Sequence, residues 1–257
     1  MISVVCVYND RHILENSLLS SLSAQQGNHE TVLIDNCKGE FKSAAAALNS
    51  GGKRAKGDFI AFVHQDITFG SKDSLARLES LIDQNPHVGI AGIAGMRDSK
   101  VVISNMTHGM PPVKVGRIRV YEPTEVQTLD ECLIIIPARI YRTLQFDEVA
   151  CDGWHLYSVD YCLSVRRLGL SVLVLPCEVH HLSSGEKSMT DDYYETLAKV
   201  MDKHRDSFPS IYTTMGNWHA GCPIVPQRVY NSFLRWFSKK TGTVTARARR
   251  IAEKLKH

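Results

Sequence analysis

Apolar runs of strand length alternate with helical patterns through the first half of the chain. Residues 2–8, 31–35, 58–64 and 88–95 are almost continuously apolar, and each run predicts a β-strand. The helical patterns between them are Leu14, Leu18 and Leu22, the alanine-rich segment 44–55, and a helix from about Ser71 with Leu75, Leu78, Leu81 and Ile82 on one face. Since strands that are apolar on both sides need cover on both sides, this order predicts an α/β fold: a mostly parallel sheet with helices on both faces.

The second half of the chain has a weaker pattern. Glycine and proline make residues 105–117 a predicted loop, and residues 146–160 are polar and aromatic without a clear period. The predicted elements here are a strand at 131–137, a helix at 158–168 that Gly169 ends, and a last strand at 171–181.

Polar residues follow three of the predicted strands directly. Tyr8-Asn9-Asp10, Asp35-Asn36 and His64-Gln65-Asp66 stand where the apolar runs stop. In parallel sheets, ligands bind beyond the carboxyl ends of the strands, so we expect these three clusters to meet in one crevice.

His64 and Asp66 form a candidate metal site within the third cluster. They are two residues apart and point the same way on extended backbone. A carboxylate here could hold Mg²⁺ or Mn²⁺ with a second ligand, which the pair His180-His181 at the end of the last predicted strand could supply. The alternatives are a polar strand end without a metal, and one packed and one exposed histidine.

The segment from Gly153 to Gly169 carries further candidate chemistry. Asp160 lies in the first turn of the predicted helix, where the partial positive charge of the helix end keeps a carboxylate ionised. An acid that only stabilises the helix start is the alternative. Trp154 is a stacking platform for a ligand or a core residue.

Composition favours a cytoplasmic protein. Of the 257 residues, 44% are hydrophobic and 22% charged, and no apolar run approaches the about 20 residues of a membrane span. No basic leader precedes the strand at 2–8, so we expect no signal peptide. The seven cysteines contain no CxxC pair, which favours reduced core thiols over disulfides or zinc.

The charge is uneven along the chain. From residue 227 to residue 257 there are nine Lys or Arg and one acid, so this stretch carries +8 and the rest −5. Residues 229–240 interleave aromatic and basic side chains, which predicts a helical tail that contacts the inner face of the membrane. The alternative is a helix packed on the domain with a disordered basic end. No recognised nucleic-acid module is present, so we expect no nucleic-acid partner.

Four motifs, taken in order, resemble those of family-2 glycosyltransferases with the GT-A fold. They are ISVVCVYND, TVLIDN, AALNSGGKRAKGDFIAFVHQD and FDEVACDGWHLYSVDYCLSVRRLGLSVLVLPCEVHHLSSG, and they cover roughly residues 2–186. The chain is most similar to a bacterial branch that writes the metal motif as HQD. The resemblance implies a GT-A domain at 1–210, with a nucleotide-binding half at 1–104 and an acceptor half at 105–210, followed by a basic extension at 211–257.

The resemblance also assigns residues to the donor and to a metal. Positions that hold or flank the donor nucleotide are matched by Tyr8, Asn9, Asp35, Asn49 and Lys53. His64, Gln65 and Asp66 occupy the Asp-x-Asp position: Asp66 matches the metal-binding carboxylate, and His64 replaces the usual first acid, with ribose or a metal-bound water as its contact. His181 matches a histidine that reaches the metal or the diphosphate, and Asp130-Glu131 matches the loop beneath the donor sugar.

The general base is the point at which the chain departs from the family pattern. Asp160 matches one acid of the motif, but Ser158 stands where another acid is common. Asp160 is therefore the expected base, with His155 and Asp152 as alternatives. A base is needed because the acceptor hydroxyl must lose a proton.

The function implied is sugar transfer, with inversion, from a nucleotide-sugar donor, expected to be UDP-linked, to a glycan or lipid-linked acceptor in cell-surface polysaccharide or lipopolysaccharide assembly. Mn²⁺ or Mg²⁺ would offset the charge on the leaving diphosphate. The alternative is an inactive relative that binds nucleotide or glycan, which the residues at His64 and Ser158 favour. No glycine-rich loop follows the first strand, which disfavours a nucleotidyltransferase or a dehydrogenase.

Overall fold

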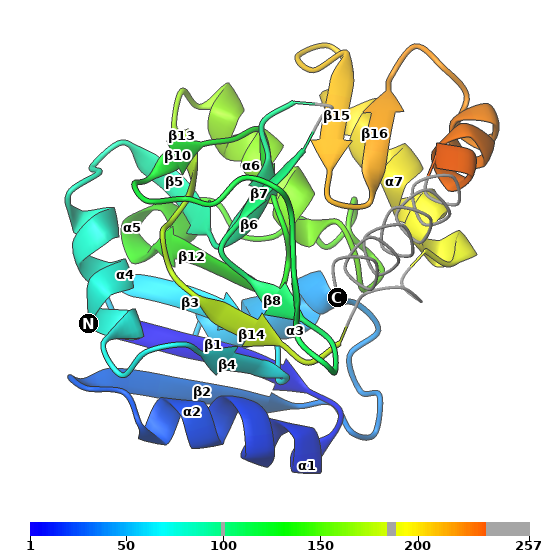
Figure 1. Cartoon of the computed structure of the whole chain (residues 1–257). Coiled ribbons are helices and arrows are strands. Elements are labelled where there is room, and N and C mark those ends of the chain that lie inside the picture. The colour runs from blue at the N-terminus through cyan, green and yellow to red at the C-terminus, as the bar shows by residue number, and fades with distance from the viewer. Residues whose placement is uncertain (99–100, 184–188, 235–257) are drawn as a thin grey trace, which may run out of the picture.

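A computed structural model describes residues 1–98, 101–183 and 189–234 (Figure 1). Its centre is a seven-stranded sheet in the order β10-β13-β5-β12-β3-β1-β2. The strands are β1 Ile2–Tyr8, β2 His29–Asp35, β3 Phe59–Val63, β5 Val88–Gly92, β10 Thr124–Glu125, β12 Leu133–Pro137 and β13 Ser171–Val174.

The direction of the strands confirms a mostly parallel sheet. β1 pairs in parallel with β2 and β3, and β13 pairs in parallel with β5. β12 lies between β3 and β5 and runs antiparallel to both, and the short edge strand β10 runs antiparallel to β13. The carboxyl ends of β1, β2 and β3 therefore lie at one edge, which is where the polar clusters were expected to meet.

Helices cover both faces of the sheet, as the apolar strands predict (Figure 1). Along β1, Val4 and Cys6 belong to one hydrophobic core and Val5 to the other, because successive side chains of a strand point to opposite faces. One face carries α1 Arg11–Leu14, the π-helical turn Glu15–Leu19, α2 Ser20–Ser23 and α4 Ser74–Asp83. The other carries α3 Ala44–Gly52, α5 Ala138–Tyr141, α6 Tyr157–Arg167 and α7 Asp191–His204.

Shorter strands build three small sheets beside the central one. Their orders are β11-β6-β7, β4-β14-β8-β9 and β15-β16. The strands are β4 Ile67–Phe69, β6 Ala94–Met96, β7 Val102–Ser104, β8 Thr107–His108, β9 Val113–Lys114, β11 Thr128–Leu129, β14 Val179–His181, β15 Ser210–Thr213 and β16 Gly216–His219. The predicted loop at 105–117 thus contains two short strands.

Three predicted elements have different bounds in the structure. The run 88–95 divides into β5 and β6, and the run 171–181 divides into β13 and β14, which pair in different sheets. Pro176, which lies in the second break, has no N–H with which to continue a ladder. The predicted cap Ser71 does not begin α4, because Asp73 is the residue that precedes the helix.

The hairpin β15–β16 spans the expected boundary between a domain at 1–210 and an extension at 211–257. That boundary falls inside β15, and the hairpin closes onto the domain: Trp218 is fully buried with Tyr193 and Tyr194 of α7. Residues 224–234 then form a helix held by the ion pair of Arg228 with Asp191 at 2.7 Å. Within the part of the chain described, no helix has the length and apolar character needed to cross a membrane. Of the stretch 229–240 that was predicted to contact a membrane, residues 229–234 belong to the helix at 224–234 and residues 235–240 lie outside the described residues.

Candidate functional site

A cavity of about 500 Å³ opens beyond the carboxyl ends of β1 and β3. All three polar clusters contribute to its wall, which confirms that they meet in one crevice. Trp154 and Tyr157, from the start of α6, close its far side. Its main lining residues are Tyr8, Asn9, Asn36, Ala44, Leu48, Phe62, His64, Gln65, Asp66, Trp154, Tyr157 and Ser183.

Gln65 joins the ends of two strands at the floor of this cavity. Its Oε1 accepts hydrogen bonds from the backbone N–H groups of Asn9 and Asp10, both at 3.0 Å, and its Nε2 donates to Asn9 Oδ1 at 2.7 Å. Gln65 thus fixes the loop after β1 against the loop after β3. Tyr8 is fixed too, because its hydroxyl donates to Asp35 at 2.8 Å.

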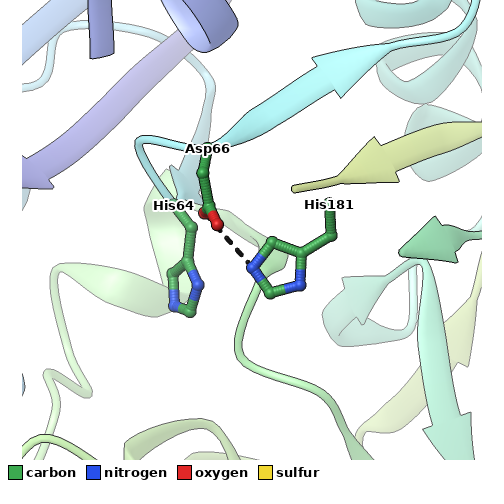
Figure 2. Close-up of side chains that lie close together, drawn as sticks. All are labelled: His64, Asp66 and His181. Atoms are coloured by element: carbon green, nitrogen blue, oxygen red, sulfur yellow. Dashed lines mark ion pairs between the residues drawn. The ribbon is translucent and has the colours of Figure 1, made fainter. Parts of the chain in front are cut away.

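His64, Asp66 and His181 form one cluster at the edge of the cavity (Figure 2). Asp66 follows β3, and His181 ends β14, which pairs with β4 so that His181 lies opposite Ile67. His181 Nε2 is 3.2 Å from Asp66 Oδ1, and the Ser183 N–H donates to Asp66 Oδ2 at 3.1 Å. The third member, His64, places its Nε2 3.3 Å from the hydroxyl of Tyr157.

The cluster holds one anionic and at least one neutral group. Burial and the neighbouring His181 lower the pKa of His64 to about 4, so this imidazole is neutral at neutral pH. Burial by itself would raise the pKa of Asp66, but the hydrogen bond with His181 and the charges of both histidines outweigh burial and lower it. Burial would likewise lower the pKa of His181, and Asp66 raises it on balance.

These residues fit a divalent cation. One ligand atom from each of the three side chains lies within 4.8 Å of the others, so a single ion can reach all three. A carboxylate with two imidazoles suits Mn²⁺ better than Mg²⁺, which prefers oxygen ligands. The structure thus brings the predicted Asp66, His64 and His181 together as three candidate ligands of one ion.

A second cavity of about 280 Å³ lies on the other side of the cluster. It shares His64, Trp154 and Ser183 with the first cavity, and His181 also faces it. Its other main lining residues are His108, Leu129, Asp130, Glu131, His155, Tyr193, Thr213, Thr214 and Met215. Among the described residues that line either cavity, none is Lys or Arg.

Two of the residues expected at the nucleotide lie elsewhere. Asn49 is 2% exposed and holds the core: its side chain bonds Phe146, Glu148 and the Tyr141 hydroxyl. Lys53 follows the far end of α3, about 13 Å along the helix from Ala44 at the cavity. Of α3, Ala44 and Leu48 in the first turns line the crevice, and Asn49 and Lys53 lie outside this lining. Asp35 contacts the site through Tyr8.

Asp160 and Asp152 line neither cavity. Asp160 is 2% exposed, with Lys203 Nζ and His204 Nε2 of α7 each at 2.8 Å from its carboxylate. Asp152 is exposed and pairs with Lys199. Both were expected as candidate bases, and in this structure neither carboxylate faces either cavity. Of the three candidates, His155 alone lines a cavity.

The structure adds Tyr157 to the site and specifies the contacts of Glu131 and Trp154. Tyr157 donates to the backbone oxygen of Glu131 at 3.1 Å while its hydroxyl faces His64. Glu131 itself reaches His155, with 3.8 Å between Oε2 and Nδ1. Trp154 is a cavity wall and not a core residue, since 42% of it is exposed. The sequence signal that could have pointed to this region was the polar and aromatic stretch 146–160, which has neither a helical nor a strand period.

Comparison with solved structures finds the same fold in GT-A glycosyltransferases. GalNAc-T7, solved with UDP, GalNAc and Mn²⁺, superposes with a TM-score of 0.58 and 14% identity over 81% of this chain and 49% of that chain. S. aureus TarS 1–349 with UDP-GlcNAc superposes with a TM-score of 0.54 and 18% identity over 79% of this chain and 66% of that chain. The mannosyltransferase PcManGT of Pyrobaculum calidifontis, with GDP-Man and Mn²⁺, superposes with a TM-score of 0.54 and 13% identity over 79% of this chain and 63% of that chain.

This chain therefore spans between about half and two thirds of the length of these structures. At such identities the likeness establishes the fold alone. No curated protein matches the chain. The sequence itself matches a family profile across residues 2–204. This range includes the residues that line the two cavities, except Thr213, Thr214 and Met215 of the second cavity. The chain belongs to the glycosyltransferase-like family.

Proposed function

We propose that this protein transfers a sugar from a nucleotide-sugar donor to a glycan or lipid-linked acceptor in cell-surface polysaccharide assembly. We expect the donor to be UDP-linked. The observation that carries the proposal is the position of His64, Asp66 and His181 between two cavities. A donor that spans them would place its nucleotide in the first cavity and its sugar at the second. The diphosphate between these parts would then lie at the three candidate metal ligands.

The lining of the first cavity supports a nucleoside as its occupant. Tyr8, Phe62 and Leu48 offer apolar and aromatic surface, while Asn9 and Asn36 offer amide groups. This combination of an apolar wall with a few placed polar groups is typical of cofactor and nucleotide sites. A divalent cation at the cluster would supply charge neutralisation for the leaving diphosphate.

Transfer with inversion is one displacement at the anomeric carbon. The acceptor oxygen forms a bond to that carbon with its lone pair, and the bond from the carbon to the diphosphate oxygen breaks. The electron pair of the broken bond leaves with the nucleoside diphosphate. The acceptor proton passes to a base, so no second catalytic acid is needed, unlike in a glycosidase with two carboxylates.

Calorimetry with UDP, with and without Mn²⁺, tests the site. The Asp66→Asn variant should bind UDP in Mn²⁺ at least about tenfold more weakly, since even groups that only support a metal ligand are worth that much. Asp83→Asn is the matched control, because Asp83 is an exposed acid at the end of α4. Equal Mn²⁺-dependent affinity in Asp66→Asn and wild type would refute the metal assignment.

The donor can be identified by thermal shift. Ligands that bind the folded state raise its apparent stability, so UDP-, GDP- and other nucleotide sugars with Mn²⁺ can be ranked by the change in Tm. Release of nucleoside diphosphate from the best donor then separates an enzyme from an inactive binding protein. Stabilisation by a donor that is never turned over, with any acceptor, would contradict transfer.

The proposal places the protein in the cytoplasm, with its basic end on the inner face of the membrane. The support is the charge of +8 from residue 227 onward, most of which lies outside the described residues. Flotation with anionic liposomes should recover the full chain and lose a chain ended at residue 234. Equal recovery of both would refute the membrane contact.

A further inference from the structure

We infer that His155, oriented by Glu131, is the general base that takes the proton from the acceptor hydroxyl in the second cavity. The inference rests on the proposed sugar transfer and deepens it by naming the residue that activates the acceptor. It departs from the expectation of an aspartate base at Asp160.

Both residues lie where an acceptor would enter. His155 lies two residues before α6, Glu131 lies two residues before β12, and both line the second cavity. His155 Nδ1 is 3.8 Å from Glu131 Oε2, and the ring packs edge-on against Tyr193 of α7 with 5.7 Å between centroids. Since Nδ1 faces the carboxylate, Nε2 is the nitrogen left for a substrate.

The backbone beside His155 is held in an unusual conformation. Leu156 has a φ of 69°, the only positive φ among the described residues that are not glycine, although it is 3% exposed and bulky. A left-handed backbone is strained for such a residue and persists only where the surroundings impose it, often at functional sites. The Leu156 backbone also lies near the Glu131 carboxylate and lowers its pKa, so the same turn approaches both members of the pair.

The surroundings suit a base that works near neutral pH. Burial raises the pKa of Glu131, and its Oε1 is buried with no hydrogen-bond partner in the part of the chain described. The interaction with Glu131 raises the pKa of His155 above its usual 6.5, against the effect of burial. The other charged or titratable groups that act on His155 are Asp192 of α7, which raises its pKa, and His64 across the cavity.

The proton transfer is balanced within the displacement. As the acceptor oxygen bonds to the anomeric carbon, its O–H bond breaks and the proton forms a new bond with Nε2 of His155. The imidazolium that results is stabilised by the Glu131 carboxylate and returns its proton to solvent after the product leaves. Glu131 does not touch the substrate in this step and is a positioning residue.

The first test compares turnover with donor binding. With the best nucleotide sugar and Mn²⁺, His155→Ala should release nucleoside diphosphate about 10²–10⁴-fold more slowly than wild type, which is the usual contribution of a positioned base. Its affinity for UDP should stay within about twofold, since the loss concerns the transition state. Asp152→Asn is the matched control, because this exposed acid is three residues away and faces neither cavity.

The second test measures the interaction between His155 and Glu131 directly. The rate should fall as the pH decreases through a pKa above 6.5, because only neutral His155 accepts a proton. In Glu131→Gln, the pKa of His155 in an NMR titration and the acidic limb of the rate profile should both move down, because the carboxylate that raises this pKa is removed. A Glu131 that only supports the fold would lower stability and leave both values in place.

The outcomes separate this inference from the function on which it rests. If wild type binds no nucleotide, the proposed function fails and the inference fails with it. If wild type turns the donor over and His155→Ala does so at the same rate, the inference alone is wrong. A wild type that binds the donor yet never releases diphosphate also counts against it, since a base in this cavity would activate water.

Discussion

Asp160 stabilises the contact between two helices. Its carboxylate is 3% exposed and holds Lys203 and His204 of α7 at 2.8 Å, while Lys203 also pairs with Asp147. When one partner of a buried ion pair is removed, the remaining charge is buried without an opposite charge beside it, which costs about 3–5 kcal/mol. Because Lys203 is partly exposed, we expect Asp160→Asn to lower the free energy of unfolding by about 3 kcal/mol.

Urea denaturation measures this loss, and turnover per folded molecule should stay near that of wild type. Asp152→Asn is the control, because Asp152 joins Lys199 of the same helix at the surface, where an ion pair is worth less than about 1 kcal/mol. An Asp160→Asn protein of unchanged stability and about a thousandfold lower turnover would restore Asp160 as the base.

Single residues of the site differ in how far the sequence predicts them. Asp66 could be predicted because it follows an apolar strand, and strand ends converge by the geometry of a parallel sheet. The surroundings of Asp160 could not be predicted, because its partners stand more than 40 residues away on α7 and no local pattern shows them. Glu131 was found only as part of a loop, since its pairing with His155 depends on where β12 and α6 meet.

Helix α3 packs closely against its neighbours on the side that carries Gly51 and Gly52. A Cβ added at Gly51 would lie 2.4 Å from Val5 Cγ1, and one at Gly52 would lie 2.4 Å from the Tyr141 hydroxyl. Overpacking typically costs 1–3 kcal/mol, while alanine gains up to about 1 kcal/mol of helix propensity. Gly52→Ala should therefore lose about 1–2 kcal/mol of stability in thermal unfolding.

Ser50→Ala in the same helix serves as the control, because Ser50 is half-buried and precedes both glycines. It should change the stability by less than about 0.5 kcal/mol, as is usual for substitutions away from a tight contact. If Gly52→Ala is as stable as Ser50→Ala, α3 has room to move outward and the close approach does not constrain it.

The elements with a strong period were predicted within a few residues, and those without one were missed. β1, β2, β3 and α6 carry continuous apolar runs or helical spacing that burial in this fold requires. The antiparallel direction of β12 could not be predicted, because a strand buried on both faces is equally apolar in either direction. The hairpin β15–β16 was missed because only two of the buried residues in its strands, Ile211 and Trp218, are hydrophobic.

The whole molecule includes this hairpin, which closes the wall of the second cavity. Thr214 donates to Asp130 at 2.8 Å, and Gln127 bonds the backbone of Ser210 and Tyr212. A chain ended at residue 210 would lose Trp218 and expose the aromatic rings of α7. Removing a buried tryptophan side chain costs about 3–5 kcal/mol, or roughly 10 °C in Tm for a protein of this size.

Differential scanning calorimetry of chains ended at residues 210 and 234 measures this difference. The longer chain keeps the hairpin and the helix at 224–234, and it should melt close to the full protein. Similar melting of both shortened chains would show that the domain ends before the hairpin, as the sequence had indicated.

Removal of the metal should affect nucleotides according to their charge. No Lys or Arg lines the described walls of either cavity, and the backbone N–H groups of Asn9 and Asp10 are taken by Gln65. Under the proposed function, a bound diphosphate would therefore depend on the cation for its neutralisation. In EDTA, we expect UDP affinity to fall more than about tenfold while uridine binding is unchanged, by calorimetry. UDP binding of equal strength with and without Mn²⁺ would contradict this.

The absence of basic side chains from the described cavity walls also has a kinetic consequence. Without fixed positive charge in the walls, nucleotide and ion would arrive and depart together, and each turnover would export one ion with the spent diphosphate. The protein would compete for ion–nucleotide complexes and not for the nucleotide pool as a whole. Inhibition by the product should then grow with free Mn²⁺, so that the ionic composition of the surroundings sets the rate at which the crevice empties.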